Sequence, residues 1–281
     1  MRLKQLYLVV FIIGISACTT SQSISNEDLN KIPEIDPGIA AVESDKEKTD
    51  ESGEDGFIKT TDEYSNKPGV VLTFDDSFYE INPNTWTRHF DLFDRYGAKV
   101  TFFVNGRTVT GFMHNAQNRG HEIGFHTVTH PRLSQVSREQ FFIETISPIA
   151  IYKEAGIELN TFAYPFGIYR EWMHDELLNH YKILRGYTER YSDDFRLYTK
   201  DEMKTGFIDS ISIDNVYYSS ETYFRNTVDK MLNSAKNEEK IVVITSHGIN
   251  NARWGITAER LEYVLQKIQE YGLLFYRFKD F

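Results

Sequence analysis

The sequence predicts an α/β fold, either an α/β barrel or a doubly wound parallel sheet, over about residues 57–281. Two runs, "GVVLTF" at 69–74 and "KIVVIT" at 240–245, are almost continuously apolar, which is typical of strands buried on both faces. Helical spacings of apolar residues alternate with such runs along the chain. A strand, a helix and a second strand in succession favour parallel pairing, and repetition of this unit gives the two candidate architectures.

The first strand–helix–strand unit covers residues 69–104. After the strand at 69–74, three large aromatic residues recur at helical spacing, and Gly97 follows as a stop signal. These aromatic residues are Trp86, Phe90 and Phe93. The next apolar run, 99–104, is the second predicted strand.

The alternation of strands and helices continues to the end of the sequence. Ser137 begins a helix, because Gln140 occupies the capping-box position. Further helices are predicted over 221–236 and from Thr257 to a stop at Gly272. Further strands are predicted at 121–125, 161–164, 181–184, 240–245 and 273–278. In both candidate architectures, functional side chains lie on loops at the carboxyl ends of the strands.

Residues 1–17 resemble an export signal rather than a part of the fold. Arg2 and Lys4 precede an apolar run at 6–15, about half of the roughly 20 residues that a membrane span needs. The run ends in "ISAC", which resembles a bacterial lipobox, and Cys18 is the only cysteine of the sequence. A plain signal peptide with an incidental cysteine is the alternative. The lipobox interpretation implies an acylated Cys18 and an exported lipoprotein anchored to a membrane, in the periplasm or at the cell surface.

Residues 18–56 are predicted to form a disordered acidic tether behind the lipidated cysteine. Eleven acidic residues stand against three lysines in this segment, and large apolar residues are scarce. The whole chain has a net charge of −10, and because most of it lies in the tether, the domain at 57–281 is only mildly acidic. This charge argues against binding to nucleic acid, which requires clustered Lys and Arg.

Polar side chains follow several of the predicted strands at their carboxyl ends. Because these strand ends meet at one side of either architecture, the groups are candidates for a common site. The four groups are Asp75–Asp76, His126 with His130, Tyr164–Gly167, and His247.

The two histidines are either metal ligands or polar residues on a helical surface. Residues 127–129 are β-branched and Pro131 blocks a continuing helix, so a tight loop is favoured. Thr127 also occupies the position where a helical zinc protease motif requires Glu. A loop can still direct the imidazoles of His126 and His130 to one ion.

The adjacent carboxylates of Asp75 and Asp76 either form an Asp-rich turn or meet these histidines. Burying both without a cation is costly. In the second case one carboxylate completes a His-His-Asp set with an open position for water or substrate, and the other lies where a general base would be. His247 is either a satisfied core histidine or the acid that protonates a leaving amine.

Four segments, in this order, resemble the NodB-homology polysaccharide deacetylases, carbohydrate esterase family 4. They are "TFDD" at 73–76, "GHEIGFHTVTHPRLS" at 120–134, "FAYPFG" at 162–167 and the late His247. The similarity covers about residues 68–281 and implies a distorted (β/α)7 barrel. It implies a divalent metal, usually zinc, with cobalt or nickel as alternatives. The implied metal ligands are Asp76, His126 and His130.

The resemblance also assigns the remaining site residues. Asp75 corresponds to the general base and His247 to the general acid, and the backbone N–H of Phe166 would donate to the oxyanion. Tyr164, Pro165 and Trp254 are expected to contact the sugar.

The sequence departs from the family pattern at three places. The Arg that pairs with the base in many members would stand at Ala163. The usual Asp-Trp motif is not recognisable, and Asp214–Asn215 with Tyr217–Tyr218 is a guess for that wall. The Leu that usually stands two residues before the late His is Thr245.

The function implied is a metal-dependent hydrolase that removes acetyl groups from N-acetylglucosamine units of a polysaccharide or oligosaccharide. Such an enzyme cleaves a linear amide C–N bond, and we expect a monomer. An O-acetyl esterase on acetylated xylan is one alternative. A non-catalytic glycan-binding module on the cell surface is the other. The sequence leaves open which glycan is the substrate.

Overall fold

Parallel strands lie side by side in the order β1-β2-β3-β4-β5-β7-β8, and pairing between β1 and β8 closes them into a barrel. The structure, a computed structural model, describes residues 67–77, 81–188, 195–204 and 206–281. The closed barrel confirms the expected (β/α)7 architecture and excludes the doubly wound sheet. The predicted signal at 1–17, the lipidated Cys18 and the tether at 18–56 lie outside the described residues.

The barrel strands are short and mostly buried. Their bounds are β1 Gly69–Phe74, β2 Thr101–Val104, β3 Glu122–Phe125, β4 Thr161–Ala163, β5 Ile183–Tyr187, β7 Phe207–Ser212 and β8 Ile241–Ser246. The remaining strands are β6 Leu197–Tyr198, β9 Gly248–Ile249, β10 Gly255–Ile256 and β11 Leu274–Tyr276. Because β9 and β10 pair only with each other, they form a separate small sheet just after β8.

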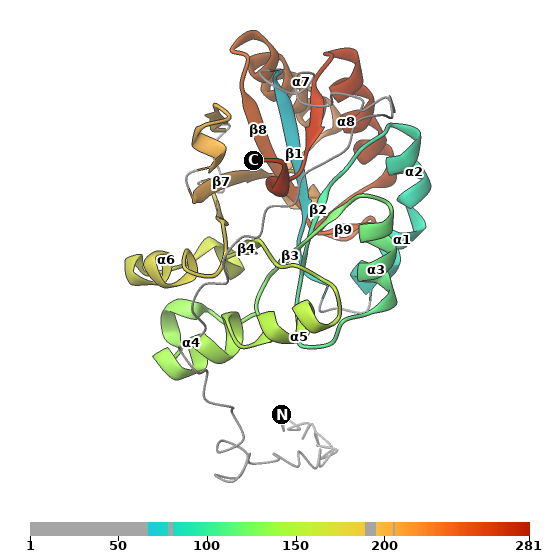
Figure 1. Cartoon of the computed structure of the whole chain (residues 1–281). Helices are drawn as coiled ribbons and strands as arrows, with labels where there is room; N and C mark the ends of the chain where they lie inside the picture. The colour runs from blue at the N-terminus through green and yellow to red at the C-terminus, as the bar shows by residue number, and fades with distance from the viewer. Residues whose placement is uncertain (1–66, 78–80, 189–194, 205) are drawn as a thin grey trace, which may run out of the picture. The chain divides into compact units, whose positions relative to one another are not determined.

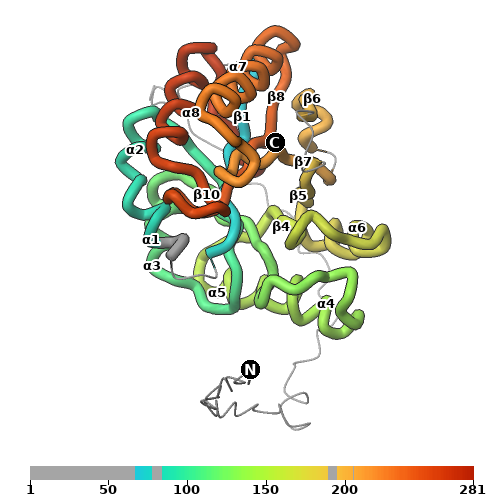
Figure 2. Tube along the Cα trace, turned by 180° about the vertical axis from the view of Figure 1, so that it is seen from behind, coloured from blue at the N-terminus to red at the C-terminus, as the bar shows by residue number. Residues whose placement is uncertain are grey.

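Helices connect the strands along the outside of the barrel (Figure 1), and the view from behind agrees (Figure 2). Their bounds are α1 Ile81–Arg88, α2 Phe90–Arg95, α3 Gly111–Asn118, α4 Arg138–Thr145, α5 Pro148–Glu154, α6 Glu171–Leu177, α7 Glu221–Asn237 and α8 Ala258–Glu270. Short 3₁₀ turns are η2 Leu133–Gln135, η3 Pro165–Gly167, η4 Glu202–Lys204, η5 Asn215–Tyr217 and η6 Phe278–Asp280. No described helix combines the length and the apolar character that crossing a membrane requires.

Two extra strands distort the barrel at its amino end. The first half of β1 pairs with β11, so that β2 pairs with β1 only at Thr73 and Phe74. On the other side, β6 runs antiparallel to the start of β8, and β7 joins β8 only from Ile211 onward. The carboxyl ends of the barrel strands therefore stay together while their amino ends are spread by β11 and β6.

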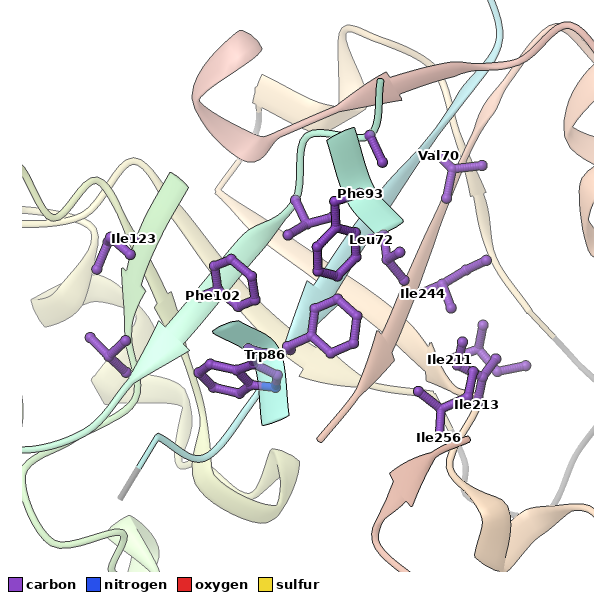
Figure 3. Packing of buried hydrophobic residues seen from close by; sticks show 14 of the residues in the cluster. Val70, Leu72, Trp86, Phe93, Phe102, Ile123, Ile211, Ile213, Ile244 and Ile256 are labelled. Carbon is purple, nitrogen blue, oxygen red and sulfur yellow. The ribbon is translucent and has the colours of Figure 1, made fainter. Parts of the chain in front are cut away.

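The hydrophobic core has an outer and an inner layer, set by the alternation of side chains along each strand. Leu72 and Ile244 point outward and pack with Phe102 and Trp86 beneath the helices (Figure 3). The inner layer fills the barrel and includes Val71, Phe103, Ala163, Ile183, Ile208, Val243 and Phe278. Every second residue of a barrel strand points inward. Where this alternation continues past the carboxyl end of a strand, the inward residue points into the mouth of the barrel. The alternation therefore decides which polar side chains can meet there.

Three predicted elements differ from the structure. The aromatic spacing at 86–93 belongs to two helices, because the chain leaves helical geometry at His89 (φ −112°, ψ 12°); the aromatic residues are still buried together. The strand predicted at 181–184 begins later, as β5, because Tyr181 packs in the outer layer instead. The closing strand predicted at 273–278 is confined to β11, and η6 follows it.

Candidate active site

Loops after β1 and β3 bring three side chains that could hold a metal ion together at the mouth of the barrel. Ligand atoms of Asp76, His126 and His130 all lie within 4.8 Å of one another. Asp76 Oδ1 is 3.4 Å from His126 Nε2 and 3.3 Å from His130 Nε2. Because these atoms converge from different loops, the loop interpretation of the histidine pair fits the structure better than a helical surface.

The chemistry of His126 fits a metal ligand. Its Nδ1 lies 2.7 Å from the carbonyl oxygen of Ala163, which accepts a hydrogen bond from the ring and leaves Nε2 facing Asp76. Burial lowers the pKa of His126 to about 4, against the opposing influence of Asp75. The imidazole is therefore neutral near pH 7, which is the form that binds a cation. Two imidazoles and one carboxylate, with an open side, match a catalytic zinc site.

The backbone of these loops is unusual. Among the described residues, five non-glycine residues have a positive φ, and four of them belong to the site. They are Asp76 (68°), Thr127 (71°), His130 (58°) and Phe166 (60°). Left-handed conformations of this kind cost free energy in residues with a Cβ and concentrate at functional sites. The surrounding structure must therefore hold the loops in place.

Two buried side chains hold the loop that carries the histidines. Glu144 of α4 accepts hydrogen bonds from the backbone N–H of Thr129 at 2.8 Å and from its hydroxyl at 2.7 Å. Asn105, after β2, donates through its amide to the carbonyl of His126. Sequence reasoning missed both residues, because neither stands in a recognisable motif.

Asp75 has a cationic partner that sequence reasoning also missed. Asp75 is fully buried, and its Oδ2 accepts hydrogen bonds from Arg185 and from the Tyr187 hydroxyl. Oδ1 is buried and accepts no hydrogen bond from any residue that the structure describes. Burial by itself raises the pKa of Asp75, but Arg185, His126, His247 and Tyr187 together lower it to about 2. The carboxylate is thus ionised at neutral pH, with one oxygen available to accept a proton.

Arg185 takes the place of the Arg that the family pattern leads one to expect at Ala163. Ala163 of β4 and Arg185 of β5 are directly paired across the two strands, and both face the interior. The cation therefore stands one strand further round the barrel and still reaches the base. A signal was present in the sequence, because an Arg inside an apolar strand requires a buried carboxylate.

His247 is oriented by Asp214, the residue that was only a guess from sequence. Its Nδ1 lies 2.6 Å from Asp214 Oδ2, and its backbone N–H donates to Oδ1 of the same residue. Its Nε2 lies 3.6 Å from Asp76 Oδ2. Burial by itself lowers the pKa of His247, but Asp214, Asp76 and Asp75 raise it to about 9. A protonated Nε2 beside the metal ligands is suited to act as an acid.

The residues expected to contact the sugar fall into two groups. Tyr164 and Pro165 are buried, and Tyr164 packs against Phe162 and His174 in the outer core. Packing therefore covers both side chains, and their contact with the sugar stays a prediction. Trp254 is 47% exposed and its ring centre lies 5.9 Å from that of His247, so its side chain is accessible at the site.

Phe166 and the guessed aromatic wall also lie near the site. The Phe166 ring packs against His130, with ring centres 4.6 Å apart. Tyr217 packs against Trp254, with ring centres 6.0 Å apart. Thr245 is buried and pairs with Thr73 of β1, two residues before Asp75.

Sequence comparison identifies a known family in the first half of the barrel. Residues 62–181 match the family model described as polysaccharide deacetylase. Peptidoglycan-N-acetylglucosamine deacetylase PgdA of Listeria monocytogenes is 26% identical over 113 residues, which are 38% of this chain and 23% of the relative. A peptidoglycan-N-acetylglucosamine deacetylase of Bacillus cereus is 35% identical over 80 residues, 27% of this chain and 28% of the relative. The chain thus spans only about a quarter of the length of these curated relatives.

Structural comparison extends the similarity to the whole barrel. The chitin deacetylase of Colletotrichum lindemuthianum superposes with a TM-score of 0.54 at 16% identity, covering 76% of this chain and 87% of that chain. A CE4 family pseudoenzyme of Bacillus anthracis superposes with a TM-score of 0.52 at 18% identity, covering 76% and 65%. At these identities the likeness concerns the fold alone. Residues 62–181 thus match the polysaccharide deacetylase family model, and the barrel as a whole shares its fold with solved deacetylases.

Proposed function

We propose that the protein is a metal-dependent hydrolase that removes acetyl groups from N-acetylglucosamine units of a glycan. One observation carries the proposal: a proton acceptor and a proton donor each touch the set of metal ligands. Oδ2 of Asp75 lies 3.9 Å from Nε2 of His126, and Nε2 of His247 lies 3.6 Å from Oδ2 of Asp76. The pKa values of the two groups, about 2 and about 9, keep the base ionised and the acid protonated at neutral pH.

Asp76, His126 and His130 would hold the ion, and a bound divalent metal would supply Lewis acidity toward the acetyl carbonyl and the attacking water. Asp75 takes a proton from this water on Oδ1, while Arg185 and Tyr187 hold Oδ2. The backbone N–H of Phe166 donates to the oxyanion, a contribution of about 3 kcal/mol for a donor of this type. His247 then delivers the proton from Nε2 to the departing sugar amine, and Asp214 keeps Nδ1 in its donor form.

The names of the curated relatives support the substrate class, since both act on N-acetylglucosamine in peptidoglycan. Support for catalysis comes from this chain's own residues. A non-catalytic module would have no need for an ionised buried Asp75 or for an oriented His247. An O-acetyl esterase would need less help at its leaving group, so it would depend less on His247.

Acetate release tests the proposal. The purified chain, supplied with zinc, should release acetate from N-acetylglucosamine oligomers, and Asp75→Asn should abolish this release. His247→Gln should reduce amide cleavage by about 10²–10⁴-fold. Retention of full ester cleavage with no amide cleavage would establish the esterase instead. Binding of metal and glycan without acetate release would establish a non-catalytic module.

Metal dependence is tested separately from activity. A chelator should remove activity, and zinc, cobalt or nickel should restore it. Zinc at a hundredfold excess over its dissociation constant should stabilise the folded chain by about 2.7 kcal/mol, because it binds only the folded form. A thermal melt should therefore shift upward with zinc in the natural chain and not in His126→Gln. An equal shift in both would exclude the proposed ligand set.

We also propose that the protein is an exported lipoprotein held at a membrane by acylated Cys18. The support is the lipobox-like "ISAC" at 15–18 and the acidic segment behind it. Metabolic labelling with a fatty acid should mark the natural chain and leave Cys18→Ser unmarked. Labelling of both would show acylation elsewhere, and labelling of neither would leave the plain signal peptide.

A further inference from the structure

Two exposed arginines flank the candidate active site, each stacked on an aromatic ring that itself touches a site histidine. The guanidinium of Arg132 lies 4.6 Å from the centre of the Phe166 ring, and that ring packs against His130. The guanidinium of Arg253 lies 5.9 Å from the Trp254 ring, and that ring packs against His247. Arg132 follows β3 and Phe166 follows β4, whereas Arg253 and Trp254 follow β8. The two stacks therefore lie on opposite sides of Asp76 in the order of strands around the barrel.

Neither arginine has a carboxylate partner. Within the part of the chain that the structure describes, no carboxylate oxygen lies within 4.0 Å of Arg132 or Arg253, whereas several other surface arginines are paired. Arg119, for example, also stacks on an aromatic ring, that of Phe90, but it pairs with Asp94 at the amino end of the barrel. Arg88, Arg107, Arg138 and Arg170 also lack a carboxylate partner among the described residues, and Arg138 stacks on Trp172, but none of these four stacks on a ring that touches a site histidine. The positive charges beside the site are therefore available to a ligand.

The geometry of a stacked guanidinium favours one kind of ligand. Stacking occupies a face of the planar group and holds its direction, while the N–H groups at its edge remain free to donate. Two parallel N–H donors match the two oxygens of a carboxylate. A sugar hydroxyl can also accept hydrogen bonds, but it has no charge that would strengthen them.

The charges at the centre of the site indicate where a carboxylate of the ligand would bind. At the centre, Asp75 is paired with Arg185 and Asp214 with His247, so the charges there already have partners within the site. The arginines attract an anion to the rim. A glycan in which a neutral N-acetylated sugar has a carboxylated neighbour would thus bind with the neutral sugar at the centre and the neighbour outside.

We propose that Arg132 and Arg253 bind carboxylates on the sugars next to the one that is deacetylated, so that the substrate is a carboxylated glycan rather than a neutral homopolymer. The inference rests on the proposed function and names its substrate class. Two chemical sources supply such a carboxylate: the lactyl ether of muramic acid in peptide-free glycan strands, and a uronic acid.

The test compares oligosaccharides of equal length with the zinc-supplied chain. The set contains a neutral N-acetylglucosamine oligomer, an oligomer alternating with muramic acid, one alternating with glucuronic acid, and the methyl esters of the last two. A carboxylated oligomer should show a kcat/KM about tenfold above the neutral one, as expected for one charge-assisted hydrogen-bonded pair. Esterification or added salt should remove the advantage. Comparison of the muramic acid oligomer with the glucuronic acid oligomer shows which sugar supplies the preferred carboxylate.

Variants assign the preference to the two residues. Arg132→Gln and Arg253→Gln should each lower the ratio of kcat/KM for carboxylated over neutral glycan about fivefold to tenfold. Arg119→Gln removes a stacked arginine at the opposite end and should leave the ratio unchanged. Equal kcat/KM for all oligomers, or a loss in the two variants that is proportional on every oligomer, would overturn the proposal.

The proposed function and this inference can fail separately. If no oligomer releases acetate, the hydrolase proposal fails. Calorimetric affinities of the zinc-supplied chain for the same oligomers then decide the second question. Tighter binding of carboxylated oligomers, lost in Arg132→Gln and Arg253→Gln, would keep the inference, and equal affinities would end it.

Discussion

Arg185 donates a hydrogen bond to Asp75 inside the barrel, and both side chains are fully buried. Arg185 reaches the base from β5, whereas the family pattern led us to expect an Arg at Ala163 on β4. The two positions are paired across the neighbouring strands, so one guanidinium can serve the same carboxylate from either. The pair keeps a buried charge neutralised and leaves Oδ1 of Asp75 to act.

Moving this arginine to β4 tests whether Asp75 requires only a neighbouring cation or requires an arginine on β5. Arg185→Ala leaves a buried carboxylate without its cation and should destabilise folding by about 3–5 kcal/mol. It should also reduce kcat, because the pKa of Asp75 rises and its orientation is lost. Adding Ala163→Arg to this variant should recover part of both losses, measured by denaturant unfolding and by acetate release.

A surface pair serves as the control. Arg196 and Asp209 form an ion pair in which the Arg side chain is 64% exposed, and exposed pairs contribute little. Arg196→Ala should change stability by less than about 1 kcal/mol. If Arg185→Ala lowered the free energy of unfolding as little as Arg196→Ala, the buried pair would contribute no more to stability than an exposed one.

The sequence predicted that Asp76, His126 and His130 lie close together, but it did not predict the residues that support them, and the reason is physical. Asp76 and the two histidines stand on loops that follow apolar strands, and parallel strands place their carboxyl ends together whatever the exact register. Predicting the role of Arg185 requires the exact end of its strand and the register of that strand against its neighbour. The strand predicted at 181–184 stopped one residue short, and only the register of β4 against β5 shows that position 185 faces the base.

The packing of side chains decides other details that the sequence does not show. Tyr164 follows a strand and stands in a matching segment, but its ring turned into the outer core. No local pattern distinguishes a tyrosine at the mouth of a barrel from one beneath its helices. Glu144 lies on a helix far along the chain from Thr129, and its contact depends on how α4 packs.

Replacing Asp214 by Asn should shift the pH dependence of catalysis. His247 must be protonated to act as the acid, so the rate falls as pH rises through its pKa, which is about 9 in the natural chain. Asp214→Asn removes the carboxylate that most stabilises the imidazolium and leaves Asp76 and Asp75. The pKa therefore falls, and the alkaline limb of the kcat/KM profile should move to lower pH.

The matched control for this shift is Asp209→Asn on β7, the strand that precedes Asp214, since Asp209 pairs with Arg196 and no interaction links it to His247. Its alkaline limb should coincide with that of the natural chain. An unmoved limb in Asp214→Asn would mean that another group limits the rate at high pH.

Glu144 should influence metal affinity without being a ligand. Its carboxylate accepts hydrogen bonds from both the N–H and the hydroxyl of Thr129, next to His130. Glu144→Gln preserves the size but removes an acceptor and the charge, so zinc affinity should fall about 10–100-fold, as for other residues that orient ligands. Competition with a chromogenic chelator measures it. Glu139→Gln, an exposed change on the same helix, should have no effect, and equal affinities in all three chains would remove Glu144 from the site.

His121 should make the fold sensitive to acid. It is fully buried, its Nδ1 accepts a hydrogen bond from the N–H of Val100, and burial lowers its pKa from 6.5 to about 3. Between these pH values the unfolded chain binds the proton and the folded chain does not, so stability falls as pH decreases. His121→Asn keeps an acceptor that does not titrate, so its unfolding free energy should fall less steeply below pH 6.5. His114→Asn, an exposed change, should follow the natural chain, and parallel slopes for all three would assign the acid sensitivity to other groups.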